Sequence, residues 1–136
     1  MQEADVTLSS TTVRLEIDLQ NRYLRLLDGE QLVLDSAVGI GRDETPTPPG
    51  TYYITDPVDL TARPDGAYGA YALGISGYSE VLLTFMGGPG QLAVHGTGNL
   101  SDLGQKVSNG CIRIPNDKIL EIAKRIPLGA PVIITA

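Results

Sequence analysis

The chain contains few of the large aromatic, cysteine and histidine residues that often stabilise a small protein. Its 136 residues include no tryptophan, one phenylalanine, one cysteine and one histidine. A single cysteine cannot form an internal disulfide, so stability must come from packing and the redox compartment cannot be inferred. Structural zinc sites use about four ligands, so metal binding is weakly supported here.

Positive charge is also scarce. Ten lysines and arginines face sixteen aspartates and glutamates, for a net charge of −6 and a pI of about 4.6. The chain therefore lacks the basic stripe that nucleic acid or anionic lipid needs, and we expect neither as a partner. No run reaches the roughly 18 apolar residues of a membrane span, and residues 1–10 do not resemble a signal peptide. If the protein is exported, we expect its signal or anchor to lie outside this chain.

Glycine, proline and hydrophobic residues are plentiful. The chain has sixteen glycines, nine prolines and 42% hydrophobic residues. This composition predicts one domain, long enough for one core, that is mainly β with one or two short helices. Residues 1–11 are polar and aperiodic, which is typical of a disordered start or a linker stub, and residues 12–136 form the predicted domain.

Hydrophobic patterns place the elements. Period-two alternation from Val13 to Leu19 predicts a strand with one buried face. The Asp28-Gly29 dipeptide predicts a tight turn, so the first three strands should be antiparallel. The prolines of 45–50 predict a rigid loop rather than a strand interior. Further strands are predicted at 23–27, 31–40, 51–55, 81–85, 91–95 (with His95 at its end) and 132–135, and a long ordered loop at 56–79.

One helix is predicted after Pro115. Four apolar residues fall on one face of it, with Asn116 or Asp117 as the N-cap. Gly129 and Pro131 should end the segment. The four apolar residues are Ile119, Ile122, Ala123 and Ile126.

The lone cysteine and the lone histidine raise a chemical question. Cys111 and His95 lie sixteen positions apart in the sequence. A thiol becomes a strong nucleophile when an imidazole can take or balance its proton. Taken singly, however, free cysteines are commonly buried as small apolar groups, and lone histidines are commonly structural. Residues 108–110 before the thiol are small or polar, so backbone N–H groups there can turn toward a developing oxyanion.

The sequence resembles the YkuD family of bacterial L,D-transpeptidase catalytic domains. The resemblance rests on His95-Gly96-Thr97, on residues 108–113 (SNGCIR) and on Asn116, and it extends to 45–51 and 68–74. These separated motifs occur in the expected order from about Thr12 to Thr135, which is more specific than any one of them. The resemblance implies a β-sandwich or open barrel of mixed strands with a catalytic loop.

The resemblance also implies roles for the residues. Cys111 becomes the nucleophile and His95 its proton acceptor or thiolate partner, oriented by a backbone carbonyl near Gly96. The N–H groups of Gly110 and Cys111 become candidates for the oxyanion hole. The family usually has histidine where this chain has Asn109, and an asparagine can donate a hydrogen bond but cannot shuttle a proton near neutral pH.

Several neighbouring residues keep two interpretations. Ser108 either bonds the catalytic imidazole or holds its own turn. Arg113 either grips a substrate carboxylate or ties the loop to Asp117 or another acid, and we favour the second. Tyr68 and Tyr71 either line the substrate groove or pack beneath their loop.

Thr97 and Asn116 also belong to the motifs that carry the resemblance. Thr97 is a candidate for substrate binding, although Thr97 and Asn116 are most simply turn and helix-cap residues.

The implied reaction is acyl transfer on peptidoglycan stem peptides. A donor tetrapeptide would acylate Cys111 as a thioester, and an amine of a neighbouring stem would resolve it, with no cofactor. Water as the acceptor would give an L,D-carboxypeptidase, and a domain without turnover would be a peptidoglycan-binding module, an alternative that Asn109 motivates. A structural thiol is the plainest alternative. The family also implies acylation of Cys111 by carbapenems and an address in the periplasm or outer cell envelope.

Overall fold

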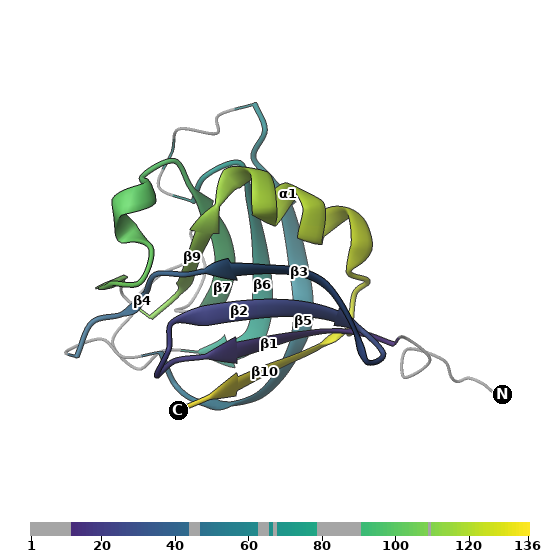
Figure 1. The fold of residues 1–136 in the computed structure, drawn as a ribbon. Helices are drawn as coiled ribbons and strands as arrows, with labels where there is room; N and C mark the ends of the chain where they lie inside the picture. Colours follow the sequence, from purple (N-terminus) through teal and green to yellow (C-terminus); the bar gives the residue numbers. More distant parts are fainter. Residues whose placement is uncertain (1–11, 44–46, 63–65, 67, 79–90, 109) are drawn as a thin grey trace, which may run out of the picture.

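The computed structural model describes residues 12–43, 47–62, 66, 68–78, 91–108 and 110–136 of the chain (Figure 1). Within these residues the fold is mostly β-strand with a single α-helix. The elements are β1 (Val13–Asp18), β2 (Tyr23–Asp28), β3 (Gln31–Ala37), β4 (Ile40–Gly41), β5 (Gly50–Asp59), β6 (Tyr71–Tyr78), β7 (Gln91–Thr97), the 3-10 turn η2 (Leu100–Asp102), β8 (Lys106–Ser108), β9 (Ile112–Pro115), α1 (Asn116–Arg125) and β10 (Pro131–Thr135).

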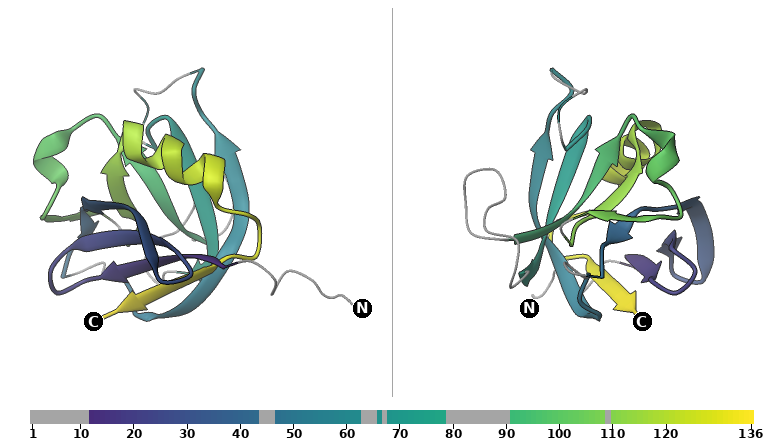
Figure 2. Two further views of the ribbon diagram at one scale, coloured as in Figure 1. Left: turned by 45° about the vertical axis from the view of Figure 1, so that its right-hand side comes forward. Right: turned by 90° about the vertical axis from the view of Figure 1, so that its left-hand side faces the viewer.

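Eight of these strands form one mixed sheet in the order β3-β2-β1-β10-β5-β6-β7-β9. The β1–β10 and β7–β9 pairs are parallel, and the other pairs are antiparallel. The two outer strands of the sheet meet, because Gly39, just after β3, exchanges two backbone hydrogen bonds of 2.8 and 2.9 Å with Arg113 of β9. The sheet therefore curves into a nearly closed barrel, which the two views of Figure 2 show.

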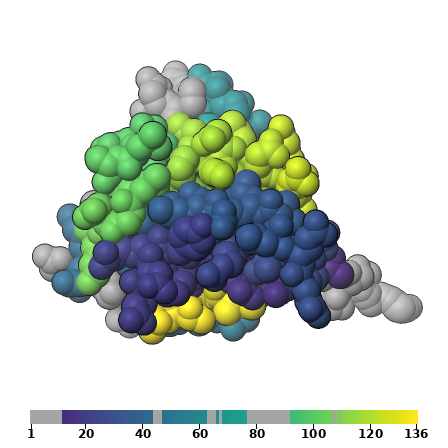
Figure 3. Space-filling model, in the orientation of Figure 1, coloured from purple at the N-terminus to yellow at the C-terminus, as the bar shows by residue number. Residues whose placement is uncertain are grey.

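The core fills the inside of this curved sheet. Leu15 and Ile17 of β1 are almost completely buried, as their alternation predicts, and α1 contributes Ile119 and Ile122. The helix packs against β6, β7 and β9, and Figure 3 shows it beside β3 on one surface of the molecule. None of the helices in the described ranges is long and apolar enough to cross a membrane.

Several of the predicted elements are confirmed. The first three strands are antiparallel neighbours, and residues 47–49 are not part of a strand. Strands also occur at 50–59, 91–97 and 131–135, and the helix occurs where its apolar face predicted it. The predicted strand at 31–40 is divided, because β4 leaves the large sheet and pairs with β8 instead. The predicted strand at 81–85 lies outside the described residues.

The prediction of a long loop at 56–79 is wrong. Strand β5 continues to Asp59 and β6 runs from Tyr71 to Tyr78, so half of this segment belongs to the two paired strands of a β-hairpin. Residues 72–75 are all buried, so β6 has no alternation of apolar and polar residues by which a pattern could identify it. Its glycines also mimic a loop composition.

Two smaller predictions also need correction. His95 lies inside β7 rather than at its end, since the strand continues to Thr97. The N-cap of α1 is Pro115, which has no side-chain capping bond, and Asn116 is the first helical residue. The Asn116 amide oxygen instead accepts a hydrogen bond from the Ala70 backbone at 2.9 Å.

Candidate active site

The pairing of β7 with β9 brings the two chemistry-bearing residues to the same face of the sheet. Their parallel register places His95 opposite Arg113 and Val94 opposite Ile112. Cys111 comes one residue before β9, so it falls beside Ala93 and one diagonal step from His95. Diagonal neighbours on adjacent strands are roughly 7–8 Å apart at their Cα atoms, which is within reach of side chains.

Tyr68 links the two residues on that face. Its ring meets the His95 ring edge-to-face, with the ring centroids 5.2 Å apart. The same tyrosine packs against a cluster formed by Ala72, Ala93 and Cys111. We call this set of side chains on the outer side of β6, β7 and β9 the outer cluster. It gathers residues from segments that are far apart in the sequence.

The His95 imidazole is held in one tautomer. Its Nδ1 lies 3.0 Å from the Gly96 carbonyl oxygen and donates to it, which leaves Nε2 as the acceptor. The side chain is 3% exposed. The pKa of His95 is lowered from 6.5 to about 4, chiefly by burial. The charge of Arg113 contributes to the decrease, whereas the hydrogen bond to Gly96 and the charge of Asp102 oppose it. The imidazole is therefore neutral at physiological pH.

The Cys111 thiol is also buried, with 5% of the residue exposed. Burial raises the pKa of this thiol, while a backbone hydrogen bond from Ala93 and the charge of Arg113 oppose the increase. The resting pair is thus a protonated thiol and a neutral imidazole rather than an ion pair. Such a pair can react when the imidazole removes the proton as the sulfur attacks.

The segment before the thiol is fixed by Ser108. Its Oγ donates to the Cys111 carbonyl at 2.5 Å and accepts the Gly110 N–H at 3.1 Å. Ser108 therefore holds its own turn, one of the two roles predicted for it. Because this bond occupies the Gly110 N–H, the Cys111 N–H is left as the candidate oxyanion donor. Gly110 has φ of 123°, a conformation that suits glycine.

Thr47 supports the same segment from a different part of the chain. Its Oγ1 donates to the Gly110 carbonyl at 2.7 Å and accepts the Gly41 N–H at 2.9 Å. The Arg42 N–H also donates to the Ser108 carbonyl at 3.0 Å. We refer to residues 108–111 as the nucleophile loop, and its described backbone is thus tied to β4. Asn109 lies outside the described residues.

Arg113 has a local acidic partner. Its Nη1 lies 3.0 Å from Asp102 Oδ2, and the Asp102 side chain is only 12% exposed. Thr97 Oγ1 also donates weakly to this oxygen, at 3.5 Å, and accepts the Asn99 N–H at 3.0 Å. The acid that pairs with Arg113 is therefore Asp102 and not Asp117. Thr47 belongs to the 45–51 stretch of the family resemblance, although the sequence indicates no role for it, and nothing in the sequence indicates Asp102.

The glycines near His95 allow two segments to approach closely. Gly69 has φ of +66°, and a Cβ there would lie 2.3 Å from the Gly96 carbonyl oxygen that holds His95. A Cβ on Gly96 would lie 2.2 Å from Asn116 Oδ1. Asn116 therefore lies between Ala70, to which it is hydrogen-bonded, and Gly96 of β7. These contacts fix the carbonyl that sets the histidine tautomer.

Tyr71 is not brought to the outer cluster. It packs against the main core and lines a separate cavity of about 290 Å³ with Leu120 and Lys124 of α1. In the described ranges, no group of three or more histidine, cysteine and acidic side chains is placed to hold a metal ion.

Comparison with known proteins gives a consistent result. The model of the YkuD family, described as the L,D-transpeptidase catalytic domain, matches residues 12–134. A relative from Bacillus licheniformis that carries the name L,D-transpeptidase YkuD is 35% identical over 122 residues, covering 90% of this chain and 65% of the relative. A Bacillus subtilis relative named for the same activity, YqjB, is 29% identical over 73% of this chain and 57% of its own length. The chain thus spans less than two thirds of the length of these relatives.

Solved structures share the fold. L,D-transpeptidase 3 from Mycobacterium tuberculosis matches with a TM-score of 0.73 and 19% identity, over 93% of this chain and 62% of that one. The same enzyme with a faropenem-derived adduct matches with a TM-score of 0.70 and 19% identity, over 93% and 61%. At this identity the likeness concerns the fold, which is confirmed as the predicted open barrel of mixed strands.

Proposed function

Since the chain belongs to the YkuD family of L,D-transpeptidase catalytic domains, we propose that it is a cysteine-dependent acyltransferase acting on peptidoglycan stem peptides. Cys111 is the nucleophile and His95 is its general base. This function places the domain in the cell envelope, where peptidoglycan lies. The observation that carries the proposal is the outer cluster, in which the lone thiol and the lone imidazole share Tyr68 as a neighbour.

The first half-reaction follows from the neutral pair. The sulfur attacks the carbonyl carbon of the third residue of a donor tetrapeptide while His95 Nε2 takes the thiol proton. The imidazolium that forms keeps its Nδ1–H on the Gly96 carbonyl. The tetrahedral intermediate then collapses, the terminal D-alanine leaves with the proton from His95, and a thioester remains on Cys111.

The second half-reaction uses the same groups in reverse order. An amine of a neighbouring stem loses a proton to His95 and attacks the thioester carbonyl, which releases the Cys111 sulfur. The product is an amide cross-link between two third-position residues, and the thiol recovers its proton.

Substrate binding requires an opening of the outer cluster. Val58 and Leu60 at the end of β5 pack against it together with Tyr68. With Cys111 at 5% and His95 at 3% exposure, a peptide reaches the sulfur only when these side chains move aside. Tyr68 is then placed to contact the bound peptide with a flat, partly polar surface.

The experiment that tests the function is intact-mass analysis of the protein incubated with a tetrapeptide stem. We expect a thioester adduct on Cys111 and release of D-alanine. Addition of an acceptor stem should remove the adduct and yield a cross-linked product. A carbapenem should form a stable adduct on the same residue.

Two variants serve as controls. Cys111→Ala should form no adduct, and His95→Ala should form it far more slowly. A wild-type protein that binds the tetrapeptide without an adduct or released D-alanine would instead be a peptidoglycan-binding module. An adduct resolved by water alone would identify an L,D-carboxypeptidase.

A further inference from the structure

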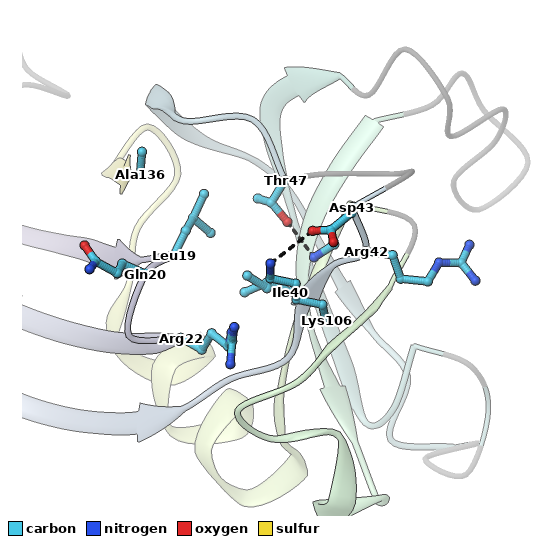
Figure 4. Close-up of a pocket in the computed structure, with 10 residues that line it drawn as sticks. Leu19, Gln20, Arg22, Ile40, Arg42, Asp43, Thr47, Lys106 and Ala136 are labelled. Carbon is cyan, nitrogen blue, oxygen red and sulfur yellow. Dashed lines mark hydrogen bonds and ion pairs between the residues drawn. The ribbon is translucent and has the colours of Figure 1, made fainter.

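A second cavity lies beside the nucleophile loop. Its volume is about 370 Å³, and it lies between the β1–β2 turn and the small β4–β8 sheet (Figure 4). We call it the basic pocket. Its lining residues are Leu19, Gln20, Arg22, Ile40, Gly41, Arg42, Asp43, Thr47, Lys106 and Ala136. A pocket of this size accommodates a ligand of a few residues.

Arg22 is fixed in an unusual way at this pocket. It has φ of 53°, and among the described residues no other non-glycine residue has a positive φ. Its carbonyl accepts the Val38 N–H, and its Nη1 donates to the Gly104 carbonyl, both at 3.0 Å. Its buried Nε has no hydrogen-bond partner in the described part of the chain. Strained residues of this kind concentrate at ligand sites.

Lys106 adds a second cation. Figure 4 shows the Arg22 guanidinium directed toward Ile40 and Lys106, whereas the Arg42 side chain extends away from them. Lys106 Nζ lies 3.0 Å from Asp43 Oδ1, with the two side chains 44% and 83% exposed. A surface pair of this kind is weak, so an incoming anion can share the ammonium. The pocket therefore favours an anion, although the whole chain carries a net charge of −6.

The remaining lining favours an anion attached to an organic group. Leu19 and Ile40 supply apolar surface beside the two cations. A guanidinium and an ammonium that face the same pocket together match the charge of a carboxylate. A carboxylate on an aliphatic stem would satisfy both parts of the pocket, which an inorganic anion would not.

The pocket also borders the nucleophile loop directly. Thr47 lines it and donates to the carbonyl of Gly110, the residue before Cys111. Strand β4 forms another wall and pairs with β8 at Ile40 and Lys106, and the next residue, Arg42, donates its N–H to the Ser108 carbonyl. A ligand in the pocket would therefore contact the elements that fix the nucleophile loop.

We propose that the basic pocket binds a carboxylate group of the peptide on which the domain acts, with Arg22 and Lys106 as the binding residues. The identity of the peptide rests on the proposed function, whereas carboxylate binding rests on the pocket alone. Stem peptides carry free carboxylates besides the one released with D-alanine. The pocket would hold one of them and position the peptide beside the nucleophile loop.

The test is an NMR titration of the ¹⁵N-labelled chain with the stem tripeptide L-alanyl-γ-D-glutamyl-diamino acid, prepared with lysine and with diaminopimelate. The tripeptide lacks the bond that the enzyme would cleave, so binding is measured without turnover. We expect the amide signals of Arg22, Ile40 and Lys106 to shift on titration. The same tripeptide with its carboxylates converted to carboxamides should bind at least about fivefold more weakly.

Charge variants sharpen the titration. Arg22→Gln should weaken binding of the carboxylate tripeptide about tenfold and leave binding of the carboxamide unchanged. If Arg22→Gln does not fold, Lys106→Gln takes its place as the charge variant in the titration. Arg125→Gln removes the same charge from an exposed position on α1 and should change neither affinity.

Three results would overturn the proposal. They are shifts confined to other parts of the chain, equal affinity for the carboxylate and carboxamide peptides, and binding of inorganic phosphate at the same amides as tightly as the tripeptide. Intact-mass analysis of Cys111 tests the proposed function separately from ligand binding at the basic pocket. An adduct without shifts at the pocket leaves the function standing, and shifts without an adduct leave the pocket standing.

Discussion

The two faces of β7 carry side chains of opposite kinds. Leu92 and Val94 point to the core together with large aliphatic residues of β6 and β9, whereas Ala93 and His95 point to the outer cluster. All four residues are nearly inaccessible to solvent. Burial alone therefore does not distinguish the stabilising face from the reactive face. The kinds of side chain do: the inner face carries large aliphatic residues, whereas the outer face combines alanines with the thiol, the imidazole and the ring of Tyr68.

Burial of a titratable side chain on the outer face costs free energy, and the inner face has no such side chain. Burying an imidazole lowers its pKa to about 4, so the folded chain resists protonation of His95. The inner face contains only aliphatic side chains and has no such dependence on pH. We therefore expect changes on the outer face to affect catalysis and its pH profile, and changes on the inner face to affect stability.

The largest expected effect follows from removal of the imidazole. His95→Gln should lower kcat/KM about 10³-fold, because a positioned general base contributes roughly 10²–10⁴-fold. As the pH falls from about 6.5 to about 4, the unfolded imidazole takes a proton before the folded one does. The wild-type free energy of unfolding should therefore fall by about 3 kcal/mol over this range through His95.

Urea unfolding at several pH values measures that second effect. The free energy of unfolding of wild type minus that of His95→Gln should increase by about 3 kcal/mol as the pH rises from about 4 and should become constant above about pH 6.5. Parallel curves for the two proteins across pH 4 to 6.5 would contradict a buried, neutral imidazole.

The second-largest effect on catalysis is expected from a larger side chain on the outer face. Ala93→Val adds two methyl groups beside Cys111, and a displacement of about 1 Å at a reacting group can cost 10²-fold in rate. We expect kcat/KM to fall about 100-fold and the free energy of unfolding to fall by about 1–3 kcal/mol. Ala130→Val adds the same atoms in the inner core and should retain kcat/KM. Similar kcat/KM values for Ala93→Val and Ala130→Val would show that the outer face tolerates a larger side chain beside Cys111.

Asp102 should have a smaller influence on catalysis. Its carboxylate raises the pKa of His95 and holds Arg113, whose charge lowers that pKa. Asp102→Asn should therefore move the acidic limb of the kcat/KM profile to lower pH and reduce kcat/KM about tenfold. Arg113→Gln should move the limb in the opposite direction. Acidic limbs that shift in the same direction in both variants would show that Asp102 and Arg113 act only through folding and not through the pKa of His95.

The smallest effect on activity is expected from the inner face. Leu92→Ala should lower the free energy of unfolding by about 2–5 kcal/mol because it leaves a cavity. The kcat/KM of the folded fraction should stay within about twofold of wild type. Thermal unfolding and activity assayed well below the melting temperature measure the two quantities. A loss of activity in the fully folded variant would remove the distinction between the faces.

Residue patterns were sufficient for the parts of the fold with one exposed face. The alternation in β1 and the apolar face of α1 identified both elements because solvent lies on one side of each. Strand β6 was missed because its side chains at 72–75 are buried on both faces and carry no alternation. The short strands β8 and β9 lie on either side of the nucleophile loop and offered too few residues for a period.

The candidate site was predictable only in part. Motif order placed His95, Cys111 and Ser108 in one site, because the motifs are local in sequence. Thr47 lies between β4 and β5, and Asp102 lies in η2, and both reach the site through side-chain contacts between distant segments, which no local spacing encodes. The direction of the two pKa shifts was equally unpredictable, since it depends on the burial of the pair.

The rate of Cys111 acylation by a carbapenem, followed by intact mass from pH 3.5 to 8, tests the account most directly. A neutral imidazole acting on a protonated thiol predicts one adduct per chain, on Cys111, at a rate that is constant above about pH 5 and falls as the pH approaches 4. A chain that gains no adduct, an adduct on another residue, or a rate that already falls between pH 7 and 6 would contradict it.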